Sequence, residues 1–105
     1  MRNIHSVVEK GEFDAVKKIV ASDSSKLAEV NNLGDQPLHT AASQRRKKIA
    51  EFLLDSGADI DARGDRGQTA LAIASKEQCR SLVKLLLERG ADPNITDDLG
   101  TTTLF

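Results

Sequence analysis

The chain has 105 residues, 39% of them hydrophobic and 30% charged, a composition that fits one small globular domain, too polar to span a membrane and too apolar to be disordered. Fifteen basic and sixteen acidic residues are spread evenly and give a formal net charge of -1, which excludes the strong positive field of a typical nucleic-acid or membrane-surface binder. The single cysteine, Cys79, has no partner for an internal disulfide, and the first residues lack the apolar run of a secretory signal, so we expect an intracellular protein, cytoplasmic or nuclear.

Residues 1–30 predict a short helix pair. Ile4 and His5 begin the first helix, and Gly11 lies in the connecting loop. The apolar side of the second helix runs from Val16 to Val20. Charged side chains around these positions would keep one end of a stack of helices hydrated, so we expect this segment to form an N-terminal cap.

Residues 31–63 predict a second, more regular helix pair. Pro37 suits the first position of a helix, because its missing N–H would have no intrahelical partner there, and apolar residues then recur at helical spacing up to Ala42. The second helix has a wider apolar stripe, from Ile49 to Leu54, and ends near Gly57, where a left-handed cap is favoured.

Residues 64–96 repeat this pattern at a spacing of thirty-three residues. Positions related by that spacing include Gly34, Gly67 and Gly100, and also Leu38, Leu71 and Leu104. Such a period is typical of a stacked-repeat protein, in which each helix pair buries its apolar side only against its neighbours. The segments between the pairs are rich in Asp, Asn and Gly, which predicts hairpin-like turns and not flexible linkers.

Two segments, Gln36–Ala41 and Thr69–Ala74, are each followed by a run of leucines and a Gly-Ala-Asp turn. These blocks resemble ankyrin repeats, whose period and Thr-Pro-Leu-His-x-Ala core they approach. The resemblance implies an all-α solenoid of stacked helix pairs joined by β-hairpin-like fingers. It also implies a single domain over 1–105, divided into an N-terminal capping repeat (1–30), a repeat (31–63), a further repeat (64–96) and a truncated repeat or C-terminal stub (97–105).

No group of residues in the sequence predicts catalysis. His5 and His39 stand where ankyrin repeats usually carry a histidine that bonds the backbone of the neighbouring finger, and no carboxylate–histidine–nucleophile set accompanies them at motif spacing. The run Asp59–Gly64 begins like a calcium loop, but Arg63 and Ala70 stand where oxygen ligands are needed. We expect a non-enzymatic chain without a cofactor or a metal.

One run of like charge, Arg45–Lys48, interrupts the even distribution of charges. Short basic clusters can serve nuclear import or nucleic-acid contact. The alternative is a solvated loop between two helices, which the neutral total charge of the surrounding repeat favours. Nucleic-acid binding through this run would weaken steeply with salt.

The resemblance implies a protein partner and places its contacts on the finger tips and on the first helix of each repeat. Because the chain has no Trp and no Tyr, arginines are the main candidate anchors, which predicts a partner with an acidic, partly apolar surface. The predicted partner-binding residues are Asn32, Leu33, Asp35, Ser43, Gln44, Arg45, Arg46, Arg63, Asp65, Arg66, Gln68, Lys76, Glu77, Thr96, Asp98, Leu99 and Thr101.

The expected function is that of a non-enzymatic protein–protein interaction module or adaptor, with no small-molecule substrate and no membrane contact. Two alternatives remain: a self-associating segment of a longer repeat array, through Leu104 and Phe105 at the C-terminal end, and nucleic-acid contact through Arg45–Lys48. Asn94 resembles the finger asparagine that asparaginyl hydroxylases can modify in ankyrin repeats, and a structural role in its turn is the alternative.

Overall fold

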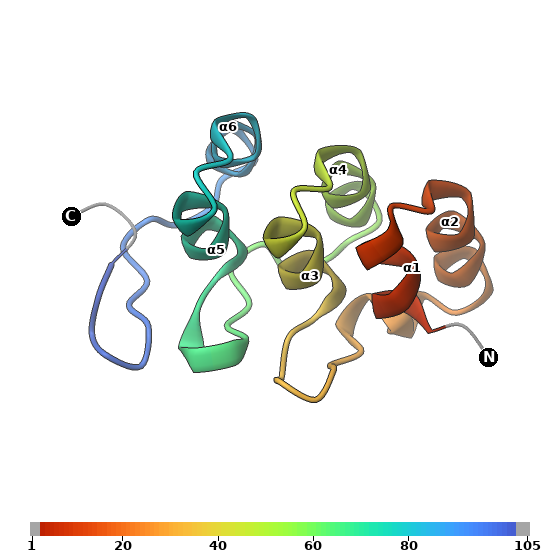
Figure 1. The fold of residues 1–105 in the computed structure, drawn as a ribbon, viewed down its shortest axis with the longest axis horizontal. Coiled ribbons are helices and arrows are strands. Elements are labelled where there is room, and N and C mark those ends of the chain that lie inside the picture. The colour runs from red at the N-terminus through yellow and green to blue at the C-terminus, as the bar shows by residue number, and fades with distance from the viewer. Residues whose placement is uncertain (1–2, 103–105) are drawn as a thin grey trace.

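The computed structural model describes residues 3–102, and Figure 1 shows them as two layers of helices with loops projecting from one side. The six α-helices in this range are α1 (Ile4–Lys10), α2 (Phe13–Ser22), α3 (Pro37–Ser43), α4 (Lys47–Asp55), α5 (Ala70–Lys76) and α6 (Arg80–Glu88). Two 3-10 turns, η1 (Ser24–Ala28) and η2 (Asp65–Gly67), complete the regular structure of residues 3–102, which contain no strand.

The helices stack into an elongated body of 39 × 26 × 21 Å. Helices α1, α3 and α5 form one layer, and α2, α4 and α6 form the other (Figure 1). Each helix contacts its partner in the pair and the equivalent helix of the next pair, as in α3 with α4 and α3 with α5. The all-α solenoid that the sequence predicts is therefore confirmed.

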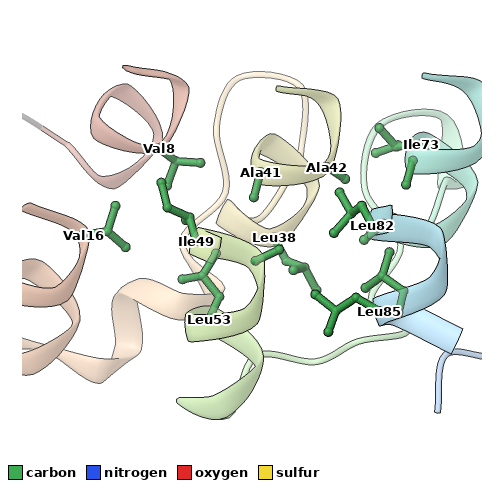
Figure 2. Close-up of a cluster of buried hydrophobic side chains, with 14 of the residues drawn as sticks. Val8, Val16, Leu38, Ala41, Ala42, Ile49, Leu53, Ile73, Leu82 and Leu85 are labelled. Atoms are coloured by element: carbon green, nitrogen blue, oxygen red, sulfur yellow. The ribbon is translucent and has the colours of Figure 1, made fainter. Parts of the chain in front are cut away.

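Aliphatic side chains of both layers fill the space between them, with alanines only on the first layer among the labelled residues (Figure 2). Ala41 and Ala74 in the first layer and Leu53 and Leu86 in the second are completely buried. A fully buried leucine contributes about 1.5–3 kcal/mol relative to an exposed one. Each helix pair shares these contacts with the neighbouring pair. The stability of a repeat therefore depends on its neighbours as well as on its own contacts.

The loop between the two helices of each pair turns through a left-handed residue. This residue is Gly11 in the first pair, Arg45 in the second and Gln78 in the third, with φ values of 74, 60 and 57°. Glycine adopts this conformation without steric strain, whereas in other residues it raises the conformational energy. Arg45 of the basic run therefore has the turn geometry that Gly11 has in the first pair.

Each helix pair leads into a finger, a tight turn on the opposite side of the first layer from α2, α4 and α6 (Figure 1). We call residues 31–35 finger 1, residues 64–68 finger 2 and residues 97–101 finger 3. In each, the first residue donates its backbone N–H to the carbonyl of the fifth, at 2.9, 2.8 and 2.9 Å respectively. These bonds close the fingers without forming a regular strand.

Candidate protein-binding surface

Both histidines bond the segment that leads into a finger. Nε2 of His39 donates to the carbonyl of Ala62 at 2.8 Å, and Nδ1 of the same ring accepts the backbone N–H of Gln36 at 2.9 Å. Because Gln36 N–H can only donate and the Ala62 carbonyl can only accept, the His39 ring is the neutral tautomer with its proton on Nε2. The predicted backbone-bonding role of His39 is confirmed.

His5 repeats this arrangement one helix pair earlier. Its Nε2 donates to the carbonyl of Glu29 at 2.8 Å, and its Nδ1 lies 2.7 Å from the hydroxyl oxygen of Thr40 on α3. The ring is buried. Both nitrogens of each histidine are therefore occupied by contacts that fix the fold.

Neighbouring fingers are bonded to each other. The carboxylate of Asp35 in finger 1 accepts the backbone N–H of Asp65 in finger 2 at 2.7 Å. The carbonyl of Arg66 in finger 2 accepts the backbone N–H of Asp98 in finger 3 at 3.0 Å. Both donors are the second residue of their finger, but the acceptor is a side chain of the fifth residue in finger 1 and a backbone carbonyl of the third residue in finger 2. Each finger is therefore bonded directly to the next.

Side-chain caps stabilise fingers 1 and 3. Oδ1 of Asn31 accepts the N–H groups of Leu33 and Asp35 at 2.9 and 3.1 Å. Oδ1 of Asp97 accepts those of Leu99 and Thr101 at 2.9 and 3.0 Å. The bond from Thr101 N–H is the main cause that lowers the pKa of Asp97 below its ordinary value.

Finger 2 has no such cap, because its first residue is Gly64. A Cβ added to Gly64 would lie 2.2 Å from Oδ1 of Asp35 and 3.0 Å from Nδ1 of His39. The contact between fingers 1 and 2 thus requires glycine at this position. The backbone of Arg66 is left-handed instead, with φ 57° and ψ 22°, and Gly67 follows at φ 71°, as in a type I′ turn.

The first two residues of the basic run join neighbouring repeats. Arg46 donates from Nη2 to the carbonyl of Glu9 at 2.7 Å, and Arg45 donates from Nη2 to the carbonyl of Glu77. These carbonyls lie at the ends of the first helices on either side. Lys47 and Lys48 are exposed on α4.

Arg63 is also used within the solenoid. Its Nε donates to the carbonyl of Gly67 at 3.1 Å, and its Nη2 lies 3.4 Å from Oδ1 of Asp98. Arg66, by contrast, is exposed, and its side chain has no hydrogen bond or ion pair with any other residue in 3–102. Of the four arginines predicted as anchors, Arg66 alone has a guanidinium without a hydrogen bond or ion pair within the described part of the chain.

The third residue of each finger lies at its tip. Leu33 is 61% exposed and Leu99 is 90% exposed, and Arg66 holds the equivalent position between them. We call these three residues the tip row. Two exposed apolar side chains at the same repeat position favour a binding role for that position more than a single one would.

The other predicted partner-binding residues differ in exposure. Asp35 and Gln68 are buried, and Asp35 serves the contact between fingers. Half-buried members are Ser43, Asp65 and Thr101, and the exposed ones are Asn32, Gln44, Lys76, Glu77, Thr96 and Asp98. The assignment of all these residues to a partner stays a prediction.

A hollow of about 440 Å³ beside finger 1 was not predicted from the sequence. It is lined by α1 residues such as Ser6 and Glu9, and by Val30 and Leu33 before and within the finger. Val30 is 57% exposed. An offset of thirty-four residues relates the first helix pair to the second and aligns Glu9 with Ser43, a predicted partner-binding residue. This alignment could have identified Glu9 from the sequence.

A second groove, of about 770 Å³, lies along the last helix pair and includes Val83 and Leu87 of α6. The residue of α4 that corresponds to Val83 is Ala50, which is completely buried against its neighbours. The predicted self-association residues Leu104 and Phe105 lie outside the described residues, so that alternative stays a prediction.

Asn94 is exposed in the turn after α6, and its N–H donates to Oδ1 of Asp92 at 2.9 Å. The structural role of this turn is therefore present, and hydroxylation of Asn94 stays a prediction. Within residues 3–102 no three His, Cys, Asp or Glu side chains cluster in a way that could hold a metal ion. Over the same residues, every helix is too short or too polar to cross a membrane.

Known proteins resemble parts of this chain. NF-kappa-B inhibitor alpha of Gallus gallus is 45% identical over 53 residues, which cover 50% of the chain and 17% of that protein. Palmitoyltransferase akr1 of Schizosaccharomyces pombe is 33% identical over 70 residues, covering 67% of the chain and 11% of that protein. The E3 ubiquitin-protein ligase XBAT32 of Arabidopsis thaliana is 35% identical over 68 residues, covering 63% of the chain and 13% of that protein.

The chain thus spans less than a fifth of the length of each of these relatives. The family model for ankyrin repeats, in three copies, matches residues 4–97. Ankyrin repeats are generally protein–protein interaction modules and are typically non-enzymatic, although some relatives are enzymes that contain such segments. With most of its length matched by that model, the chain belongs to the ankyrin-repeat family.

Proposed function

We propose that this chain is a non-enzymatic protein-interaction module that binds its partner through the finger tips and the exposed side of α1, α3 and α5. The observation that carries the proposal is the exposure of the tip row above fingers whose backbones are fixed. Leu33 and Leu99 are 61% and 90% exposed, while bonds within and between fingers hold them in place. Binding to such a surface loses little conformational entropy.

The histidine contacts support a non-enzymatic role. Both ring nitrogens of His5 and of His39 are engaged in hydrogen bonds within the fold. A general base needs a nitrogen that can reach a substrate proton. These rings serve the packing of the fingers instead.

The contacts of the basic run favour a protein partner over a nucleic acid. Arg45 and Arg46 donate to carbonyls of neighbouring repeats, so half of the run is committed to the stack. Lys47 and Lys48 lie on α4, in the layer away from the fingers (Figure 1). A nucleic acid bound there would contact two exposed lysines, which is a small electrostatic footprint.

The test compares capture of proteins from a lysate by the immobilised chain and by a variant of the tip row. The variant carries Leu33→Ser, Arg66→Ser and Leu99→Ser, and spares Arg63 because that side chain holds finger 3. We expect the variant to keep its helical circular dichroism and to lose the captured proteins.

A matched control changes one leucine and two cations of α6, with Arg80→Ser, Lys84→Ser and Leu87→Ser. These residues line the groove at the last helix pair. Capture that survives the control and disappears with the tip-row variant supports the proposal. Capture that disappears only with the control would move the binding surface to that groove and reject the proposal.

A further inference from the structure

We propose that the tip row binds a polyproline-II segment of the partner that carries an apolar residue, an acidic residue and an apolar residue at positions i, i+3 and i+6. This inference rests on the proposed function and names the chemistry of the partner. Leu33 and Leu99 would contact the two apolar residues, and Arg66 would contact the acidic one.

The spacing of the tip row determines the backbone of the bound segment. The fingers follow the stack of α1, α3 and α5 (Figure 1). Because packed helices have axes about 8–10 Å apart, we expect a similar spacing between neighbouring tips. A polyproline-II chain has three residues per turn and rises about 3.1 Å per residue, so every third side chain lies on the same side, about 9 Å further along. A β-strand has a period of two, which would turn every third side chain to the opposite face.

The fingers keep this spacing without a bound partner. Asp65 N–H donates to the Asp35 carboxylate at 2.7 Å, and Asp98 N–H donates to the Arg66 carbonyl at 3.0 Å. These bonds join finger 1 to finger 2 and finger 2 to finger 3. The three tips are therefore preorganised for a segment with a regular repeat.

Charge selects the central residue of the segment. Arg66 is exposed and makes no side-chain hydrogen bond or ion pair within residues 3–102. Two carboxylates of the neighbouring fingers have other partners: that of Asp98 lies 3.4 Å from Arg63, and that of Asp35 accepts the N–H of Asp65. An acidic side chain of the partner would give Arg66 a charge-assisted contact, with planar bidentate geometry.

The backbone of Arg66 determines how its side chain leaves the tip of finger 2. Arg66 holds φ 57° and ψ 22°, a conformation that is unfavourable for a long side chain and that Asn or Gly would adopt with less strain. At this tip the conformation presents the one predicted anchor whose guanidinium makes no hydrogen bond or ion pair within residues 3–102.

Apolar contacts select the two ends of the segment. Leu33 lies with the exposed Val30 at the edge of the hollow beside finger 1, which can take a branched aliphatic side chain. Leu99 is 90% exposed at the other end of the row. Both would bury apolar surface that has no partner within the described residues.

The experiment uses the full chain and the peptide Leu-Pro-Pro-Glu-Pro-Pro-Leu between solubilising Gly-Ser tails, with fluorescence anisotropy as the readout. We expect saturable binding that weakens about tenfold when Lys replaces the central Glu. With the Arg66→Glu variant, the Lys peptide should bind more tightly than the Glu peptide. The matched control Arg80→Glu, which changes an exposed arginine on α6, should leave the original preference intact.

The second part of the experiment varies the number of residues between the apolar and acidic positions of the peptide. Peptides with two or four residues per step should bind about tenfold more weakly than the peptide with three. Equal binding of the Glu and Lys peptides, or a preference that Arg66→Glu does not reverse, would overturn the proposed chemistry. Tighter binding of a helical peptide with seven residues per step would overturn the polyproline-II backbone.

The lysate capture separates failure of this inference from failure of the proposed function. If the peptide does not bind but capture still depends on the tip row, the protein-binding role stands and the polyproline-II segment is wrong. If neither the peptide nor any protein depends on the tip row, both proposals are wrong.

Discussion

Fingers 1 and 2 occupy the same place in their repeats and turn in different ways. Finger 1 begins with Asn31, whose side chain caps the turn, and Gly34 is its left-handed residue, at φ 86°. Finger 2 begins with Gly64, and both Arg66 and Gly67 are left-handed. The comparison shows that a side chain of one repeat can change the backbone conformation of the finger that it contacts in the next repeat.

The cause lies in finger 1. Its Asp35 carboxylate points into finger 2, where it accepts the N–H of Asp65 and leaves no space for a side chain at Gly64. Without a side chain at that position, finger 2 loses the cap that Asn31 provides in finger 1. Arg66 then adopts the conformation of a type I′ turn.

The largest effect expected from this comparison is that of Gly64→Ala. The new Cβ would displace the Asp35 carboxylate and press on His39, so we expect the free energy of unfolding to fall by about 3 kcal/mol, as when a buried hydrogen-bond network is broken. Urea denaturation measures this. The control Gly34→Ala meets no atom within 4 Å but has φ 86°, and should cost about 1 kcal/mol through backbone strain alone. Equal losses for the two variants would reject the steric explanation.

His39→Ala tests the bond that holds the segment before finger 2. The substitution removes the partners of Gln36 N–H and of the Ala62 carbonyl, and we expect a loss of about 2 kcal/mol in the free energy of unfolding. The following repeat already has alanine, Ala72, at the equivalent position. The His39→Ala variant therefore also tests whether the stack tolerates a second repeat without this histidine. Hydrogen exchange should show the loss of protection concentrated around residues 58–68; a uniform loss would contradict the local role.

Arg66→Asn is expected to stabilise finger 2, in contrast to the two preceding substitutions. Because Asn tolerates the left-handed conformation better than Arg, we expect a gain of about 0.5–1 kcal/mol in the free energy of unfolding together with weaker binding of the acidic peptide. Thermal denaturation and anisotropy measure the two effects. Leu33→Asn is the control, since Leu33 is not among the residues with positive φ and should give no such gain. A stabilised variant with unchanged binding would remove Arg66 from the proposed site.

The smallest expected effect is a pH dependence of the finger 3 cap that the finger 1 cap does not share. The pKa of Asp97 in the folded chain is lowered from its ordinary value of 3.8, mainly by the Thr101 N–H. The ionised cap therefore contributes stability above pH 3.8 and loses it as the pH falls through the lower folded pKa. Asn31 has no carboxylate, so finger 1 should not share this change. Amide NMR shifts of Leu99 and Thr101, compared with those of Leu33, would show it.

Asp97→Asn provides the control for the pH experiment, because it gives finger 3 the cap of finger 1. Its amide shifts should stay constant over the range in which those of the original chain move. A pH response that survives this substitution would have to come from another group.

Sequence reasoning succeeded where local chemistry decides the structure. Pro37 at the start of α3 and Gly57 after α4 mark helix ends whose signals lie within a few residues. The thirty-three-residue spacing placed Leu38 and Leu71 in equivalent buried positions. The backbone role of His39 came from the resemblance to a family in which that position is used in this way.

Sequence reasoning could not assign the arginines. Arg45, Arg46 and Arg63 were predicted as anchors together with Arg66, but the first three contact residues that lie four to thirty-seven positions away. A charged side chain on a loop can reach solvent, a partner or a neighbouring carbonyl. The choice among these depends on which groups the stack brings within hydrogen-bond distance.

By itself the sequence determined the period, the helix pairs, the buried leucines and the positions of the fingers, because hydrophobic spacing and turn residues act over short stretches of chain. Only the tertiary structure decided why Gly64 must lack a side chain, which of the predicted arginines makes no hydrogen bond or ion pair within residues 3–102, and how neighbouring fingers are bonded to each other. Those features arise where one repeat meets the next, since hydrogen bonds such as that from Asp65 to Asp35 join residues thirty positions apart.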